Sequence, residues 1–309
     1  MAFEHIPVML DQVIEMLKPR EGGVFLDGTL GGGGHSQALL ARGAAVYGVD
    51  RDSDALAAAT QRLRAFPLFH AIYGNFHDLP ALAKAHGIPP LDGVLLDLGV
   101  SSFQLDTPSR GFSYHADAPL DMRMDQSQAF SARELVNEWP QKEIARILWE
   151  YGEERWAERI AAIIVEHREQ KPLETTADLV RAVDAAIPRR VRNQDKGHSA
   201  QKTFQAVRIA VNDELGPLAQ ALEDAVSLLK PGGRLAVITF HSLEDRVVKL
   251  TFRRLEHPCT CPPELPVCIC GKKPTVCLPQ RNNALTPSQE EIKQNPRARS
   301  AKLRVAEKL

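Results

Sequence analysis

The chain has 309 residues, about twice the size of a common domain, so one large domain or two are expected. Hydrophobic residues make up 44% and charged residues 25%, which excludes a disordered, collagen-like or coiled-coil chain. No apolar run approaches the ~20 residues that span a bilayer. Residues 1–7 have no basic start before an apolar stretch, and five cysteines argue against a disulfide framework. We therefore expect a soluble cytoplasmic enzyme or binding protein with no membrane partner.

The first 100 residues alternate between strand and helix patterns. Short apolar runs predict strands, and Ala- and Leu-rich stretches between them predict helices: strands at 24–27, 44–50, 68–73 and 91–97, and helices at 35–42, 53–64 and 77–86. Apolar strands that alternate with helices of 8–12 residues predict a parallel sheet covered on both faces.

The centre of the chain has a different pattern. Residues 131–187 contain no strand run and predict three or four amphipathic helices. The α/β pattern resumes with a long helix over 201–229, kinked at Gly216-Pro217, a turn over 230–233 and a strand over 234–240. We predict one α/β domain, residues 1–105 and 201–309, interrupted by an inserted helical domain over 106–200.

Charge is unevenly distributed along the chain. The net charge is −1, but residues 245–309 hold 13 Lys and Arg against 6 Asp and Glu, a net of +7. The preceding 244 residues hold 25 basic and 33 acidic residues, a net of −8. A basic segment on an acidic body suggests a nucleic-acid partner, and a basic solvated surface is the alternative.

A glycine run follows the first predicted strand. The segment reads Asp27-Gly28-Thr29-Leu30-Gly31-Gly32-Gly33-Gly34-His35 and opens a helix whose N–H groups can face a ligand. The dinucleotide pattern G-x-G-x-x-G is not met, because Ser36 occupies the third position. Asp50 ends the second strand, where an acid can accept both hydroxyls of a ribose. A flexible turn without a ligand is the alternative.

Two further features favour a class I, Rossmann-like methyltransferase that uses S-adenosylmethionine. Lys230-Pro231-Gly232-Gly233 precedes a late strand, and Asp97 ends the fourth strand. Enzymes that methylate nucleobase amines are similar here, although this chain lacks their prolines and aromatic residue after the acid. A nicotinamide-dependent oxidoreductase on the same fold remains an alternative, as does a non-catalytic RNA-binding assembly factor.

Longer strings resemble one family nearly from end to end. They include the following segments: HIPVM from His5, DGTLG from Asp27, LLDLGVSS from Leu95, RGFSY from Arg110, PLDMRMD from Pro119, YGEER from Tyr151, KTFQA from Lys202, RIAVNDEL from Arg208, TFHSLEDR from Thr239 and NPRARSAKLR from Asn295. Together they are similar to the bacterial ribosomal RNA small-subunit methyltransferase H family.

The resemblance implies a reaction and a set of contacts. The reaction is N4-methylation of a cytidine in the decoding region of 16S ribosomal RNA within the small ribosomal subunit, with S-adenosylmethionine as donor. The family's cofactor contacts fall on residues present here: Gly33, Gly34, His35, Asp50, Phe76, Asp97 and Gln104. The resemblance also implies that the helical domain helps to recognise substrate, and it suggests a homodimer.

Four polar residues could position the cytosine amine. The amine is a poor nucleophile, so it must be held in line with the S–C bond while its hydrogen bonds are accepted. Ser101 and Ser102 follow the fourth strand, and His241 and Ser242 follow the strand at 234–240. Helix capping is the alternative role for each. His5 has the same status, and the sequence leaves the catalytic residue unknown.

A basic run near the end of the inserted domain is a candidate RNA-backbone surface. It contains Arg189, Arg190, Arg192 and Lys196, with Asp195 opposing it. A solvated loop is the alternative.

Cysteines cluster near the C-terminal end. Cys259, Cys261, Cys268 and Cys270 form a C-x-C pair, a six-residue spacer and a second C-x-C pair. Zinc sites usually use C-x2-C pairs, and C-x-C spacing strains tetrahedral closure. We therefore expect thiols without a metal.

Overall fold

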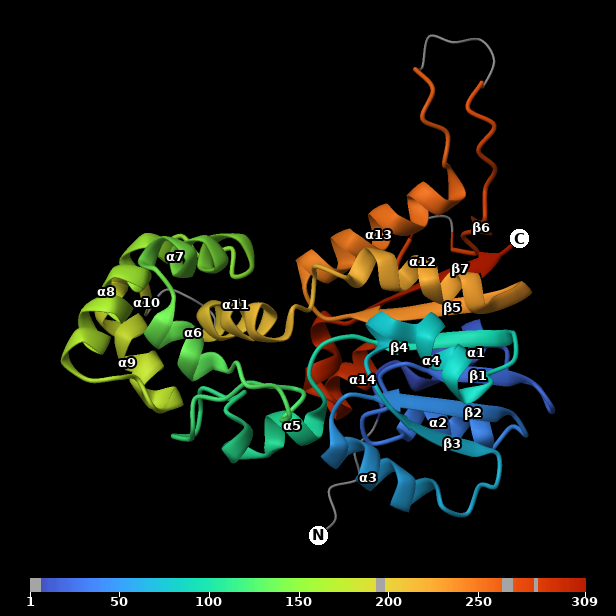
Figure 1. The fold of residues 1–309 in the computed structure, drawn as a ribbon, viewed down its shortest axis with the longest axis horizontal. Helices are drawn as coiled ribbons and strands as arrows, with labels where there is room; N and C mark the ends of the chain where they lie inside the picture. Colours follow the sequence, from blue (N-terminus) through green and yellow to red (C-terminus); the bar gives the residue numbers. More distant parts are fainter. Residues whose placement is uncertain (1–6, 193–197, 263–268, 281–282) are drawn as a thin grey trace. The chain divides into compact units, whose positions relative to one another are not determined.

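The computed structural model describes residues 7–192, 198–262, 269–280 and 283–309. Its chain forms two compact units, shown in Figure 1. The sheet unit comprises Met1–Gly99 with Leu215–Leu309, and the helical unit comprises Val100–Glu214. These boundaries differ from the predicted 106 and 200, because the helix that begins at residue 201 packs within the helical unit.

The sheet unit alternates strands and helices in the predicted manner. Its elements are α1 Leu10–Leu17, β1 Val24–Asp27, α2 Gly34–Leu40, β2 Ala45–Asp50, α3 Ser53–Leu63, β3 Phe69–Tyr73, η1 Phe76–Asp78, α4 Leu79–His86, β4 Leu91–Asp97, α12 Leu218–Leu228, β5 Leu229–Thr239, α13 Ser242–Glu256, β6 Val276–Cys277, α14 Gln289–Gln294, η3 Pro296–Ser300 and β7 Lys302–Lys308.

The strands form one seven-stranded sheet in the order β3-β2-β1-β4-β5-β7-β6. Strands β1 to β5 pair in parallel, and β7 pairs antiparallel with both β5 and β6. Chain order therefore reverses beside β1, which places the loops after β1 and β4 on either side of a topological switch point. The mostly parallel α/β sheet expected from the sequence is confirmed.

Successive strand residues enter two different cores. Phe25, Leu95 and Ile238 join the cluster under α1, α2 and α3. Leu26 and Leu96 join the cluster under α4, α12 and α13. This alternation follows from the two-residue period of a strand and requires helices on both faces, as Figure 1 shows.

The helical unit contains no strand among its described residues. Its elements are α5 Ser102–Asp106, η2 Pro108–Arg110, α6 Ala132–Glu138, α7 Gln141–Glu150, α8 Ala157–Gln170, α9 Thr176–Ala186, α10 Arg189–Arg192 and α11 Gln201–Asn212. They share a separate apolar core that includes Ile144, Ile160 and Val207. Buried Asn212 joins α11 to the loop between η2 and α6. It donates to the Met122 carbonyl (2.7 Å) and accepts from the Met124 N–H (2.8 Å).

The predicted kinked helix over 201–229 is wrong. α11 ends at Asn212, and Asp213 takes a left-handed conformation (φ 45°) before Pro217 caps α12. The break coincides with the boundary between the units at residue 214. The predicted turn over 230–233 lies inside β5, where the pairing with β4 shifts between Leu229 and Arg234.

The basic C-terminal segment is built into the sheet unit. Asp245 of α13 accepts hydrogen bonds from Arg304 (2.7 Å) and Lys302 (3.0 Å) of β7, and Arg254 pairs with Glu223. Burial opposes ionisation of Asp245, but its two cationic partners hold the pKa of this carboxyl below its usual range. Part of the positive charge counted in the sequence is thus neutralised locally.

Among the described residues, no helix is both long and apolar enough to cross a membrane.

We expect Asp245→Asn to lower the free energy of unfolding by about 3 kcal/mol at neutral pH, because it leaves the largely buried Arg304 guanidinium without its counter-charge. The lowered pKa means that this stability is present above the usual aspartate pKa and is lost as pH falls through the folded value. Urea titration measures both effects. Glu223→Gln, which breaks an exposed pair, should cost less than about 1 kcal/mol. Equal losses in the two variants would contradict the expectation.

Candidate functional site

The glycine loop connects β1 to α2 at the carboxyl edge of the sheet. Gly33 has a left-handed φ of 74°, and a Cβ there would lie 3.0 Å from Leu63 and 3.2 Å from Ala59 of α3. A Cβ on Gly34 would collide with Pro7. A Cβ on Gly32, in contrast, would have no atom within 4 Å, so the loop is open at that residue. Packing thus explains why positions 33 and 34 are glycines, and the loop has open space beside Gly32.

Asp50, at the end of β2, is fixed by backbone donors. Its Oδ2 accepts from the Gly31 N–H (2.8 Å), and its Oδ1 accepts from the Asp52 N–H (2.9 Å). Burial raises the pKa of Asp50, and these two hydrogen bonds partly offset the rise. Each oxygen keeps a second lone pair, so the carboxyl can accept further hydrogen bonds.

Three more carboxyls interact at the same edge of the sheet. Asp27 is buried at the end of β1, where Oδ2 accepts from the Ser36 hydroxyl (2.8 Å). Glu244 of α13 is also buried, and its Oε2 accepts from the Phe240 N–H (2.8 Å). Asp97 ends β4, and its Oδ1 has no hydrogen-bond partner in the described part of the chain although that atom is buried. We call Asp27, Asp97 and Glu244 the carboxyl cluster.

Burial and mutual repulsion disfavour negative charge in this cluster. Burial, then the neighbouring carboxyls of Asp27 and Glu244, raises the pKa of Asp97 well above its usual range. Burial raises the pKa of Asp27 to about 6, against the opposing hydrogen bonds from Ser36 and Thr29. A cationic ligand would relieve this repulsion, because it would supply the counter-charge that the cluster lacks.

Two of the other predicted contacts border these acids. His35 is buried at the start of α2, with Nε2 3.0 Å from the Val8 carbonyl oxygen and Nδ1 3.9 Å from Asp97 Oδ2. Phe76 begins η1 after β3 and is half-buried, and its Cβ is 3.2 Å from the position of a Cβ on Gly28. The sheet unit therefore brings together Gly33, Gly34, His35, Asp50, Phe76 and Asp97 along one edge.

The candidates after β5 have capping roles. The His241 side chain accepts from the Glu244 N–H (3.4 Å) at the start of α13, and its Nε2 lies 3.0 Å from Glu244 Oε1. Ser242, the first residue of α13, is exposed. His241 is thereby linked to the carboxyl cluster through Glu244.

Three predicted residues belong to the helical unit. Ser101 caps α5 by accepting from the Gln104 N–H (3.2 Å), and Gln104 Oε1 accepts from the Ser101 N–H (3.1 Å). Gln104 is buried, and Ser102 is half-buried. The capping alternative thus describes Ser101 in this structure.

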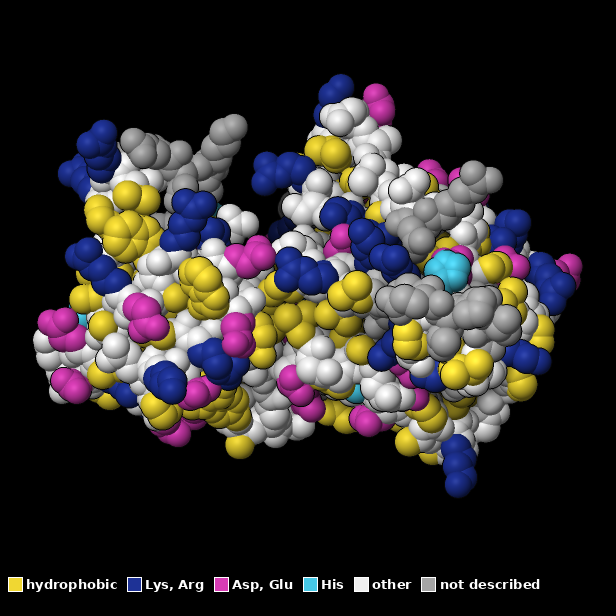
Figure 2. All heavy atoms as spheres, turned by 90° about the horizontal axis from the view of Figure 1, so that it is seen from above, with side chains coloured by type: hydrophobic (Ala, Val, Ile, Leu, Met, Phe, Trp, Pro, Cys, Tyr) yellow, Lys and Arg dark blue, Asp and Glu magenta, His cyan; other side chains and the backbone are white. Residues whose placement is uncertain are grey.

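The predicted RNA-contacting arginines differ in their surroundings. Arg189 and Arg190 are exposed on α10, whereas Arg192 pairs with Asp184 of α9 (2.8 Å). Lys196 and His5 lie outside the described residues. On the face of the molecule in Figure 2, Lys and Arg side chains occur in several separate groups with acidic and hydrophobic side chains between them.

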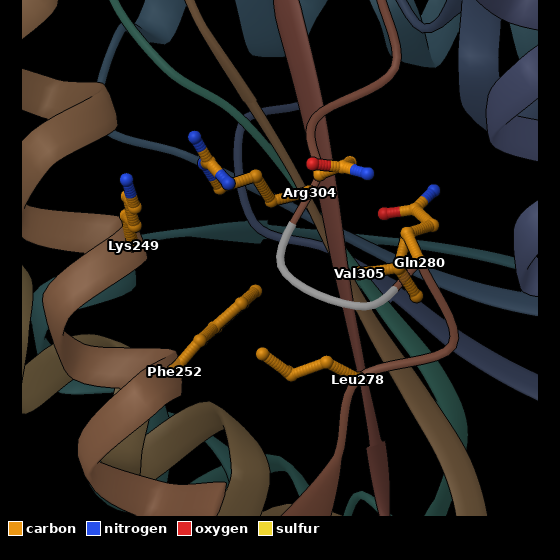
Figure 3. A pocket seen from close by; sticks show the side chains of 7 residues that line it. Lys249, Phe252, Leu278, Gln280, Arg304 and Val305 are labelled. Atoms are coloured by element: carbon orange, nitrogen blue, oxygen red, sulfur yellow. The ribbon is translucent and has the colours of Figure 1, made fainter.

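A small pocket elsewhere in the sheet unit contains none of the predicted residues. Figure 3 shows its lining by Lys249 and Phe252 of α13, Leu278, Gln280, and Arg304 and Val305 of β7. Its volume of about 10 Å³ is room for roughly one water molecule, which excludes a nucleoside in this conformation.

Asp27, Ser36 and Glu244 belong to the site although no role was predicted for them from the sequence. Asp27 ends a strand just as Asp50 and Asp97 do, and that position was the available signal. Glu244 lies in a helix three residues after His241, where a capping box with N3 Glu is a recognisable pattern. Its proximity to Asp97 depends on β4 and β5 being neighbours, which only the fold supplies.

The strand order, the antiparallel β7 and the acids at the switch point define a class I methyltransferase fold. The MraW methylase family model matches residues 2–309, and the chain belongs to this family. A protein of Symbiobacterium thermophilum named ribosomal RNA small subunit methyltransferase H is 54% identical to this chain, over 100% of this chain and 98% of the relative. A protein of the same name from Heliobacterium modesticaldum is 55% identical over 100% of both chains. The family resemblance inferred from the sequence is confirmed.

A solved rRNA methylase from Streptococcus thermophilus is 13% identical over 99% of both chains with a TM-score of 0.43, too weak a likeness to support any assignment.

The raised pKa of Asp27 predicts the direction in which the stability of the chain changes with pH. The folded chain holds this proton more tightly than the unfolded chain, so ionising Asp27 costs stability as pH rises from about 4 to about 6. The stability of Asp27→Asn relative to the natural chain should therefore increase across that interval by on the order of 2–3 kcal/mol in urea titrations.

Asp92→Asn is the matched control. Burial opposes ionisation of Asp92, but Lys230, the Val24 N–H and Arg20 lower its pKa. The relative stability of this variant should fall as pH rises toward the usual aspartate pKa of 3.8, the opposite direction, and should change little from there to about pH 6. The same pH trend in both variants would refute the assignment of a raised pKa to Asp27.

Proposed function

We propose that this protein transfers a methyl group to N4 of a cytidine in the decoding region of 16S ribosomal RNA, within the small ribosomal subunit. Relatives at 54–55% identity over the whole chain carry the name of an rRNA small subunit methyltransferase, and this similarity is the main support for the RNA substrate. The observation in the site that carries the proposal is the carboxyl cluster, in which Asp97 Oδ1 is buried and has no hydrogen-bond partner within the described ranges of the chain.

The methyl donor is S-adenosylmethionine, which supplies an electrophilic methyl group on a sulfonium centre. Its two cationic centres, the sulfonium and the methionine ammonium, fit a site where buried carboxyls repel one another. An ammonium group has three donors, and Asp97 Oδ1 is an acceptor that this structure leaves unused. The charge of the carboxyl cluster and the buried acceptor Asp97 Oδ1 together support binding of S-adenosylmethionine at this site.

Other residues would hold the nucleoside part of the donor. Asp50, at the end of β2, has the lone pairs to accept two ribose hydroxyls and is oriented by the Gly31 and Asp52 amides. Phe76 offers an aromatic face for adenine. The opening at Gly32 lets the loop backbone approach the ligand, while Gly33 and Gly34 keep the loop packed against α3 and Pro7.

The chain's task in the chemical step is positioning. The cytosine amine must lie in line with the S–CH3 bond. As the new N–C bond forms, the S–C bond of the sulfonium breaks, and the nitrogen then loses one proton. Ser101, Ser102, His241 and Ser242 are the candidates for accepting its hydrogen bonds. His241 is linked to the carboxyl cluster, because its Nε2 lies 3.0 Å from Glu244 Oε1.

The central test is transfer of tritium from labelled S-adenosylmethionine to 30S subunits, to free rRNA and to a short RNA, followed by nucleoside analysis. We expect N4-methylated cytidine from at least one of the three. S-adenosylmethionine at about 100 times its Kd should stabilise the fold by about 2.7 kcal/mol, and a nicotinamide dinucleotide should not. Absence of N4-methylated cytidine in every case would refute the proposal.

Asp97→Asn should weaken S-adenosylmethionine binding roughly 10- to 100-fold in calorimetry, because it removes a charged acceptor. The fold should remain stable, since the substitution also removes repulsion with Asp27 and Glu244. Asp92→Asn makes the same change at the opposite end of β4 and should leave the affinity unaltered. Full affinity in Asp97→Asn would exclude the assigned contact.

Arg189→Glu with Arg190→Glu should weaken RNA binding and reduce its dependence on salt, because two exposed cations that can contact phosphates are reversed. Affinity for S-adenosylmethionine should not change. Arg192 is left intact because it pairs with Asp184. Lys142→Glu, an exposed charge reversal on α7, is the control, and an equal loss of RNA binding there would count against a specific role for α10. Gel filtration of the same samples tests the expected homodimer.

A further inference from the structure

Residues 257–275 form a long excursion that connects α13 to β6. None of its described residues is buried, and Ile269 is 78% exposed. Its two arms run side by side away from the sheet unit in Figure 1. At its base the Thr275 N–H donates to the Leu255 carbonyl (3.0 Å), and the Leu278 N–H donates to Glu256 (3.1 Å). Connections longer than about 12–15 residues without secondary structure are uncommon in compact domains and are often functional.

Three cysteine sulfurs meet between these arms. Cys259 and Cys261 lie on the outgoing arm and Cys270 on the returning arm, and their Sγ atoms all lie within 4.8 Å of one another. The Cys259 and Cys270 sulfurs are 3.9 Å apart. A disulfide would require about 2.05 Å, so these sulfurs are not bonded to each other. Two thiolates on one tetrahedral zinc ion are about 3.8 Å apart, from a Zn–S length of about 2.3 Å.

The backbone around the sulfurs also suits a thiolate site. The Ile269 N–H points to Cys261 Sγ at 3.4 Å, and such a donor stabilises negative charge on sulfur. Gly271, directly after Cys270, has a left-handed φ of 66°, which turns the chain sharply beside the sulfur. Cys259 and Cys261 still form one C-x-C pair, but in this structure their Sγ atoms and that of Cys270 already lie within 4.8 Å of one another.

We propose that Cys259, Cys261 and Cys270 bind one Zn²⁺ ion, which fixes the excursion between α13 and β6. Thiolates select zinc among common divalent ions, and each cysteine releases its proton on binding. Three thiolates leave one tetrahedral position for a fourth ligand. Cys268, the remaining cysteine of the pattern, lies outside the described residues. This site is independent of the methyl-transfer proposal.

The first test is metal analysis of the full-length chain, purified without added metal. We expect one zinc per chain, and the same content in Cys277→Ser, because Cys277 lies in β6 outside the trio. Cys259→Ser and Cys270→Ser should each lose most of the zinc while circular dichroism shows an unchanged fold. Zinc content that is absent, or equal in all four proteins, would overturn the proposal, as would iron in place of zinc.

The second test uses the natural chain and needs no variant. Alkylation of each cysteine is followed by mass spectrometry with zinc bound and after removal of the metal with a chelator. Zinc should slow labelling of Cys259, Cys261 and Cys270 by about tenfold or more, because coordinated thiolates are poor nucleophiles, and should not change the rate at Cys277. Equal rates with and without zinc, or a disulfide found between the cysteines, would refute the site.

Discussion

Burial of carboxyl groups at the carboxyl ends of parallel strands is the constraint on which the site depends. Asp27, Asp50 and Glu244 receive hydrogen bonds from the Thr29, Gly31 and Phe240 N–H groups, which lie in the turns after β1 and β5. Asp27 also accepts from Ser36 of α2. The loop geometry that satisfies the acids is therefore the geometry that shapes the ligand site. Asp97 Oδ1 is the exception, because it is buried with no hydrogen-bond partner among the described residues, and an unsatisfied buried acceptor costs stability.

The two units contribute differently to such an enzyme. The sheet unit has two apolar cores, one on each face, and these hold the strand ends in fixed register. The helical unit has its own core and its own polar anchors, including Asn212 and the Arg208–Glu214 pair near its end. Each unit is thus stabilised by interactions within itself, as expected of a domain with its own hydrophobic core.

The sequence predicted the elements of the sheet well, because strand period and glycine position are local signals. It missed β7, because Lys302–Lys308 is rich in charge and lacks an apolar run. The place of β7 in the sheet also depends on pairing with β5, about 65 residues earlier in the chain. It also joined α11 to α12, since no local pattern shows that Asp213 ends a helix by taking a left-handed conformation. The acids at the strand ends could be found from the sequence. Their repulsion could not, because Glu244 reaches Asp97 only through the neighbouring positions of β4 and β5.

The position of β7 has a consequence for synthesis of the protein on the ribosome. The sheet cannot close between β5 and β6 until Lys302–Lys308 has left the exit tunnel, whereas every residue of the helical unit has been made by residue 214. The helical unit can therefore fold while the sheet is still incomplete, and the exposed edge of β5 must be protected from pairing with other chains during that interval. Vectorial synthesis would thus complete the helical unit first and the sheet unit last.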